Sequence, residues 1–306
     1  MTHDQQHAGV DAARPFGRLL TAMVTPFTAD GELDLDGAAR LATYLVDEQA
    51  NDALVINGTT GESPTTTDAE KERLLRAVVE AVGDRAKVIA GVGTNDTRHT
   101  IELATRAEKA GVHGLLVVTP YYNKPPQAGL LRHFTAVADA TGLPVMLYDI
   151  PHRTGVPITA ETMVRLAEHE RIVAVKDAKG DLTATSWVLS RTDLAYYSGD
   201  DALTLPLLSI GGVGLVGTST HLCGALAKQM IEAYERGDVA KAQALHRRLL
   251  PIFTGIFRTQ GAILVKAAMA ARGLPAGPVR PPLVDATDAE IEQLRRDCAD
   301  AGLPLP

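Results

Sequence analysis

The chain has 306 residues, of which 45% are hydrophobic and 22% charged, and its 30 Lys plus Arg and 37 Asp plus Glu give a formal net charge of −7. This composition is typical of globular proteins with a sizeable core, and it argues against disorder and coiled coil. The negative charge, with only 1 Trp, 7 Tyr and 5 Phe, disfavours nucleic acid or an anionic membrane as the main partner.

The first 16 residues are polar and lack an apolar stretch, so we expect a flexible tail and not a signal peptide. No apolar run approaches the ~18–20 residues that span a bilayer. Cys223 and Cys298 lie far apart and lack CxxC spacing, which predicts no disulfide framework and suits a reducing compartment. We therefore expect a cytoplasmic protein.

From Gly17 onward, short apolar runs alternate with segments of helical periodicity. The predicted strands are LLTAMVTP, ALVING, KVIAGVG, GLLVVTP, PVMLYDIP, IVAVKDA, LAYYSGD and VGLVGTS. The predicted helices between and after them cover 36–48, 68–82, 97–110, 127–140, 159–168, 183–189, 202–209 and 225–236. Unbroken apolar strands are typical of parallel sheets covered on both faces.

Eight strand–helix units within about 220 residues match the size of a (β/α)₈ TIM barrel. We expect this barrel to occupy residues 17–238, with a doubly wound open sheet as the alternative. The periodicity then becomes wholly helical, over 239–250, 259–272 and 287–301. Residues 239–306 should therefore form a small all-helical extension.

In such a barrel the active site lies where the strands end, because the βα loops meet there. The segments that follow predicted strands and carry reactive or anion-binding side chains are GTTGE, TPYYN, YDIPHRTG, VKDAKGD and SGDD. Gly199, in SGDD, is assigned to the substrate site.

Lys176 ends the apolar run that begins at Ile172, which directs its ammonium group toward the barrel mouth. Burial there disfavours the charged form, and lowering a lysine pKa by ~2–3 units produces an amine that can attack a carbonyl. The alternative is a structural ion pair with Asp177 or Asp200. Four other lysines are expected to be solvated charges, Lys87 at a strand start and Lys71, Lys109 and Lys241 on helices.

Tyr148 ends the preceding strand, so its phenol should lie near Lys176 and could move protons. The alternative is an aromatic side chain that fills the top layer of the barrel. Thr59 and Thr60, in a glycine-bounded turn, offer hydroxyls and backbone N–H groups suited to a carboxylate. The alternative there is a polar loop that caps the next helix.

Tyr121 and Tyr122 follow the fourth strand, and a pair of loop tyrosines is more typical of an oligomer contact than of a catalyst, although both roles could coexist. Arg153 could bind a substrate carboxylate in bidentate fashion, or form a surface ion pair. GVGTND lacks the third glycine of a dinucleotide loop, and His3 and His7 lie in the polar tail. We expect no metal and no cofactor.

Six motifs, GTTGES, TPYYNKPPQ, LYDIPHRTG, VAVKDAKGD, YSGDD and GGVGLVGTS, resemble in order and spacing those of the dihydrodipicolinate synthase family, from about Gly17 to Leu303. Some are shared with N-acetylneuraminate lyase and 2-keto-3-deoxy sugar-acid aldolases. The YYNKP loop and the arginine in PHRTG favour the synthases. The resemblance implies condensation of pyruvate with aspartate semialdehyde, in diaminopimelate and lysine synthesis. A sugar-acid aldolase and a non-catalytic pyruvate-binding paralogue are the alternatives.

The resemblance also implies residue roles. Those for catalysis are Lys176 as the Schiff-base lysine and, for proton transfer, Tyr148, Thr59 and Tyr122, the last supplied by a neighbouring subunit of a homotetramer. Those for binding are Thr60 and the backbone around Val216 for pyruvate, and Arg153 for the semialdehyde. In the lysine-sensitive pattern of this family an acidic residue stands where this chain has His99, so we expect weak or absent inhibition by lysine.

Overall fold

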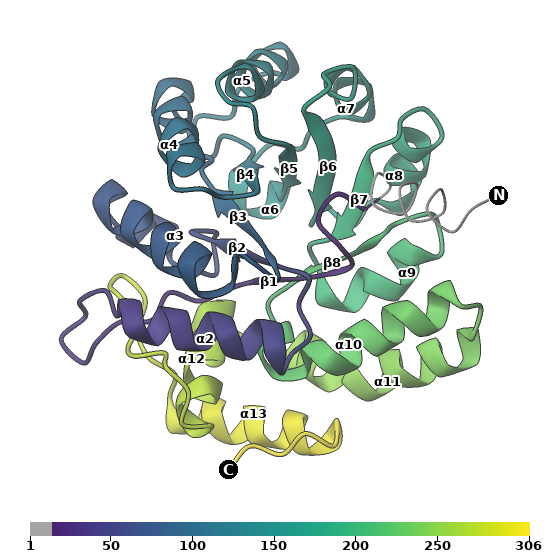
Figure 1. Cartoon of the computed structure of the whole chain (residues 1–306). Coiled ribbons are helices and arrows are strands. Elements are labelled where there is room, and N and C mark those ends of the chain that lie inside the picture. Colours follow the sequence, from purple (N-terminus) through teal and green to yellow (C-terminus); the bar gives the residue numbers. More distant parts are fainter. Residues whose placement is uncertain (1–13) are drawn as a thin grey trace.

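The computed structural model describes residues 14–306, in which eight parallel strands form a closed barrel (Figure 1). Each strand pairs with the next, and β1 pairs with β8 to close the barrel. The fold is therefore the predicted (β/α)₈ barrel, and the open sheet is excluded. The strands are β1 (Leu19–Ala22), β2 (Ala53–Ile56), β3 (Lys87–Gly91), β4 (Gly114–Val118), β5 (Val145–Asp149), β6 (Ile172–Asp177), β7 (Ala195–Ser198) and β8 (Gly214–Gly217).

Helices surround the barrel and follow its strands. They are α2 (Leu35–Asp47), α3 (Asp68–Val82), α4 (Thr97–Lys109), α5 (Gln127–Asp139), α7 (Ala160–Leu166), α8 (Leu182–Leu189), α9 (Thr204–Leu208) and α10 (Thr220–Glu235), with the short turns η1 (Ser63–Thr65), α6 (Pro151–Thr154) and η2 (Asp201–Leu203). Most predicted boundaries agree within two residues. Helix α10 begins five residues before the predicted start, across a kink where Cys223 has non-helical backbone angles.

The strands point alternate side chains into the barrel and toward the helices, since successive residues of a strand face opposite ways. Leu20, Met146 and Ala174 belong to the cluster inside the barrel, whereas Leu19 and Val175 pack against the helices. Lys176 lies two residues beyond Ala174, and Tyr148 lies two beyond Met146. The pleat therefore directs both side chains into the barrel at the end of their strands.

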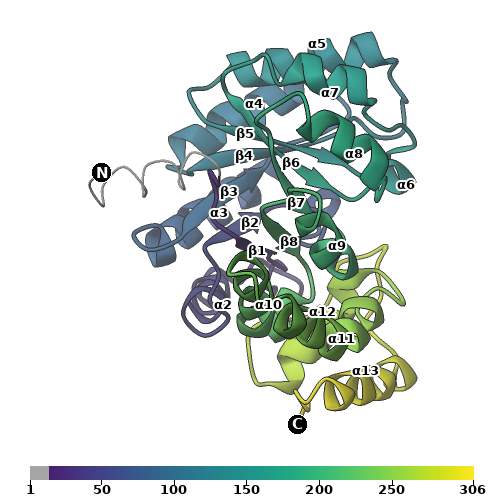
Figure 2. The same cartoon turned by 90° about the vertical axis from the view of Figure 1, so that its right-hand side faces the viewer.

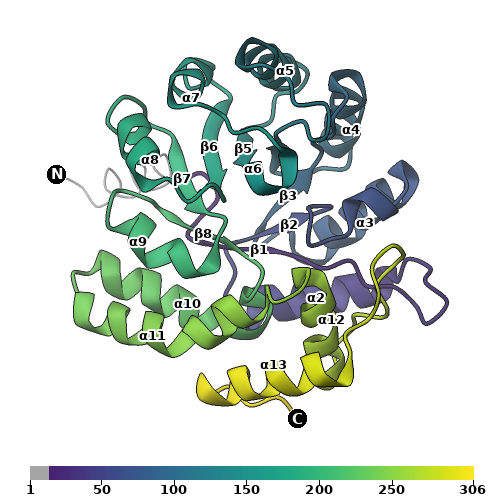
Figure 3. The same ribbon diagram turned by 180° about the vertical axis from the view of Figure 1, so that it is seen from behind.

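The C-terminal helices α11 (Val239–Gly255), α12 (Gly261–Ala271) and α13 (Asp288–Asp300) gather on one side of the barrel, beside α2 and α10 (Figures 1 and 2). Figure 3 shows the same group from the opposite side. Helix α11 continues through Pro251, beyond the predicted end at residue 250. The division into a tail, a barrel of 17–238 and a helical region of 239–306 remains a prediction.

The N-terminal prediction lies mostly outside the described residues, since it covers residues 1–16. Phe16, which it assigns to the tail, is buried, and its N–H donates to the Tyr197 hydroxyl at 3.3 Å. In the part of the chain from residue 14 onward, no helix has the length and apolar character needed to cross a bilayer.

Candidate active site

Lys176 and Tyr148 lie side by side at the ends of β6 and β5, where they are register partners. The Lys176 Nζ atom lies 4.3 Å from the centroid of the Tyr148 ring, and both side chains are buried. Burial lowers the pKa of Lys176 to about 8, although the Asp201 carboxylate opposes this change. The site therefore holds an amine with a substantial neutral fraction, which a nucleophile requires.

The alternative of a structural ion pair for Lys176 is not observed among residues 14–306. The Asp177 carboxylate accepts from Lys179 N at 2.8 Å and from Thr185 Oγ1 at 2.6 Å. Asp200 accepts from Ala202 N at 3.0 Å, as the cap of η2. Both carboxylates thus organise their own loops.

Tyr148 and Thr59, on the loop after β2, lie together in the walls of the cavities at the strand ends. Burial raises the pKa of Tyr148 to about 12, while Arg153 and a side-chain hydrogen bond with Thr59 lower it. Tyr148 therefore stays protonated near neutral pH and can donate or relay a proton.

Thr60 and the loop after β8 meet across the barrel mouth. The Thr60 Oγ1 atom lies 3.2 Å from Thr218 Oγ1. Thr218 N and Ser219 N donate to Asp201 Oδ1 at 3.2 and 2.9 Å, and the Ser219 hydroxyl donates to the same oxygen. Val216 precedes this turn on β8 and is buried inside the barrel. The buried Asp201 thus fixes the turn opposite Thr60.

Gly199 packs directly against the lysine. A Cβ atom at this position would lie 3.0 Å from Lys176 Cγ and 3.0 Å from Ala178 Cβ. Its N–H already donates to Asp177 O at 2.7 Å. Gly199 therefore leaves space beside the amine, and its N–H is not free to bind a ligand.

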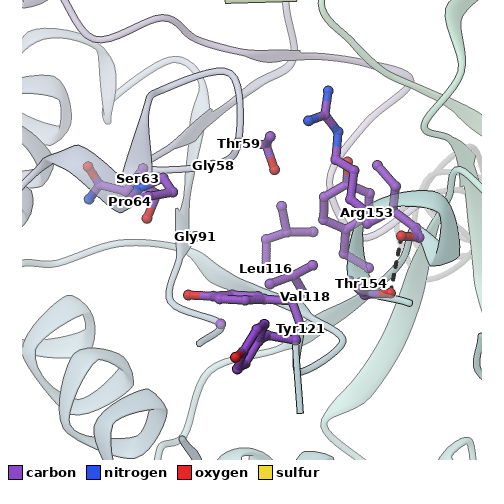
Figure 4. A pocket seen from close by; sticks show the side chains of 15 residues that line it. Gly58, Thr59, Ser63, Pro64, Gly91, Leu116, Val118, Tyr121, Arg153 and Thr154 are labelled. Carbon is purple, nitrogen blue, oxygen red and sulfur yellow. Dashed lines mark hydrogen bonds between the residues drawn. The ribbon is translucent and has the colours of Figure 1, made fainter. Parts of the chain in front are cut away.

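Two neighbouring cavities open at the strand ends and share Thr59, Tyr148, Ile150 and Arg153 in their walls. One has about 450 Å³ and contains Lys176, together with Thr60, Gly199 and Thr218. The other has about 350 Å³ and is shown in Figure 4, with Ser63 and Pro64 on one side and Arg153 on the other. These volumes suit a small-molecule substrate.

Arg153 and the loop tyrosines lie at the outer wall of these cavities. Arg153 lies on α6, a turn that starts with Pro151 and ends at Gly155, whose φ of 82° suits glycine. Its guanidinium forms no ion pair within residues 14–306, so the surface-pair alternative is not observed. Tyr122 is 89% exposed and Tyr121 is 37% exposed, and both line the 350 Å³ cavity.

One lysine prediction is wrong. Lys109 and Lys241 are exposed, as expected, but Lys71 is buried on α3. Its Nζ atom donates to the backbone carbonyls of Ser63, at 2.9 Å, and of Thr66. Burial lowers the pKa of Lys71. Helical periodicity placed this residue on α3 but carried no information about the loop that covers it.

The sequence analysis did not predict two other buried polar residues near the site, Asp201 and Glu62. Asp201 lies in a segment rich in acidic residues, but nothing in that pattern shows which carboxylate is buried. Glu62, next to the threonine pair, is also buried and binds residues that follow it by about 200 positions. Among the described residues no group of three or more His, Cys, Asp or Glu side chains could hold a metal ion.

Comparisons with a family model and with curated proteins both lead to one family. The model of the dihydrodipicolinate synthetase family matches residues 15–301. A 4-hydroxy-tetrahydrodipicolinate synthase of Acidothermus cellulolyticus is 77% identical over 94% of this chain and 93% of its own length. A second such synthase, from Streptomyces coelicolor, is 66% identical over 95% of this chain and 97% of its own length.

Solved structures agree with the sequence comparison. A dihydrodipicolinate synthase of Cyanidioschyzon merolae, crystallised with lysine bound, superposes with a TM-score of 0.92 at 46% identity and covers 94% of this chain and 99% of its own. A dihydrodipicolinate synthase of Bacillus anthracis has a TM-score of 0.90 at 43% identity, covering 93% and 98%.

Proposed function

Because the chain belongs to the dihydrodipicolinate synthetase family, we propose that it is a lyase that condenses pyruvate with L-aspartate 4-semialdehyde to 4-hydroxy-tetrahydrodipicolinate. This reaction belongs to diaminopimelate and lysine biosynthesis. The observation that carries the proposal is the buried Lys176 amine, 4.3 Å from the Tyr148 ring, in a cavity of about 450 Å³.

The first half of the reaction forms an enamine. The neutral Lys176 amine attacks C2 of pyruvate, and loss of water from the resulting carbinolamine leaves a protonated imine. This imine withdraws electrons from C3, so a C3 proton can leave and the enamine forms without a cofactor. Tyr148, Thr59 and Tyr122 move the protons, and Thr60 with the backbone around Val216 holds the pyruvate carboxylate.

The second half forms the ring. The enamine C3 attacks the aldehyde carbon of the semialdehyde, and the resulting alkoxide takes a proton from the relay. The amino group of the semialdehyde then attacks the imine carbon, closes the ring and expels the Lys176 amine. Arg153 lies in the walls of both cavities, where its guanidinium can bind the semialdehyde carboxylate.

We further propose a cytoplasmic homotetramer in which Tyr122 enters the site of a neighbouring subunit. The 89% exposure of Tyr122 supports this, because a relay group needs a partner that excludes water.

Conversion of pyruvate with aspartate semialdehyde, measured beside N-acetylneuraminate and 2-keto-3-deoxy acids, tests the function. Borohydride reduction with pyruvate should add one adduct, on Lys176. Turnover of the sugar acids alone, or an adduct elsewhere, contradicts the proposal.

A further inference from the structure

Glu62 holds a backbone conformation that its residue type disfavours. Its φ of 55° and ψ of 39° lie in the left-handed region, which glycine adopts without strain. Glu62 N–H donates to Thr59 O at 3.2 Å, so the turn includes the proposed relay threonine. Since glycine would serve the backbone better here, the position must need the carboxylate.

That carboxylate is buried against the C-terminal helical region. Its Oε1 lies 2.6 Å from Lys266 Nζ on α12, and the two side chains are 1% and 3% exposed. Its Oε2 accepts from Arg280 N at 2.8 Å, from a residue 218 positions later. Lys266 Nζ also donates to Pro278 O at 2.8 Å. Both carboxylate oxygens therefore contact the segment that runs from Lys266 to Arg280.

The Arg280 side chain contacts the same loop at a second place. Its guanidinium donates to Thr65 O at 2.8 Å and pairs with both oxygens of Glu70, at 2.6 and 3.1 Å. Lys266 Nζ and the Arg280 guanidinium lie 4.2 and 4.1 Å from the ring centroid of Phe27, within the range of cation–π contacts. The loop after β2 is thus held at Glu62 and at Thr65.

We propose that Glu62, Lys266 and Arg280, here called the loop clamp, position Thr59 and Thr60 for the reaction. This inference rests on the proposed function. The clamp residues touch no substrate and act through the loop, so they are positioning residues. A group displaced by about 1 Å can lose ~10²-fold in rate, and a loop tied at two points, one of them a buried ion pair, resists such displacement. The C-terminal helical region thereby supports the active-site loop from outside the barrel.

The test compares two steps in the Glu62→Gln variant. At saturating pyruvate, reduction of the imine reports Lys176 on β6 and should stay within about twofold of the original protein, whereas a displaced Thr60 should raise the pyruvate concentration needed for saturation. Exchange of the pyruvate C3 protons with deuterium requires the Thr59 relay and should slow about tenfold or more. If the ion pair only stabilised the fold, its loss would change imine reduction and proton exchange to the same extent.

Two further variants separate positioning from stability. Glu235→Gln makes the same change in an ion pair with Arg14 and Arg18 near the start of β1, far from the site, and should leave exchange unaltered. Glu62→Gln with Lys266→Met removes the unpaired buried ammonium and should recover melting temperature but not exchange.

The outcomes distinguish the two proposals. The positioning role of the loop clamp is overturned if the rate of proton exchange follows the melting temperature in all variants. It is also overturned if this rate is unchanged in Glu62→Gln. If the original protein forms no condensation product, the proposed function fails instead.

Discussion

The rate of pyruvate capture should depend on pH through Lys176. With a pKa of about 8 in place of 10.5, about one amine in eleven is neutral at pH 7, against about three in ten thousand for an ordinary lysine. The structure thus increases the reactive fraction about 300-fold. We expect kcat/KM for pyruvate to rise about tenfold per pH unit below pH 8 and to level off above it, because this parameter reports the free enzyme.

Two neighbouring charged groups shift the pKa of Lys176 in opposite directions. Asp201 raises the pKa of Lys176 and Arg153 lowers it, although burial has the larger effect. Asp201→Asn should therefore move the midpoint to lower pH, and Arg153→Gln should move it to higher pH. Asparagine retains an oxygen for Thr218 N and Ser219 N, so the turn should persist.

The measurement is the initial rate of condensation with aspartate semialdehyde across pH 6 to 10, at low pyruvate. The phenol of Tyr148 has a pKa of about 12 and does not titrate in this window, so a midpoint near 8 belongs to the amine. A rate that still climbs tenfold per unit at pH 10, or equal shifts in both variants, would refute this reasoning.

Three other results are expected. Tyr148→Phe should lower kcat by ~10²–10⁴-fold while pyruvate still forms an adduct on Lys176, and turnover within tenfold of the original would remove the phenol from the relay. Mixing Tyr122→Phe with Lys176→Ala should restore activity in hybrid oligomers; no recovery after subunit exchange, shown by native mass spectrometry, means that Tyr122 does not act across an interface. Millimolar L-lysine should inhibit weakly, because the resemblance implies a carboxylate for the ammonium at the position of His99, whose imidazole lies 3.0 Å from Asp68 here, and loss of that carboxylate costs ~3–5 kcal/mol. Half-inhibition below about 1 mM, in an inhibition titration, contradicts this.

The sequence predicted the barrel well because each strand is a short apolar run and most helices show their own period. Some helices also begin with a capping side chain, such as Thr67 on α3 and Asp96 on α4. The same logic placed Lys176 and Tyr148 together, since neighbouring parallel strands end at the same edge. Turn α6 was missed because four residues are too few for a period to show.

Contacts between distant segments could not be predicted in this way. The burial of Lys71 depends on the carbonyls of a loop, and that of Glu62 depends on Lys266 and Arg280, far along the chain. Periodicity reports which side of a helix faces inward, not which groups cover it. The sequence around Glu62 does not show that its carboxylate pairs with Lys266, which lies on a helix about 200 residues later.

The long separation between Glu62 and Arg280 has a consequence for synthesis of the protein. A growing chain folds from its N-terminus, and contacts between remote segments form late. The barrel cannot close until β8 has left the ribosome, because β8 pairs with β1. The loop with Thr59 must wait longer, for Lys266 and Arg280. We therefore expect a nascent chain to acquire its chemistry at one of the last steps of folding, and chains released before α12 to remain inactive even with every catalytic side chain present.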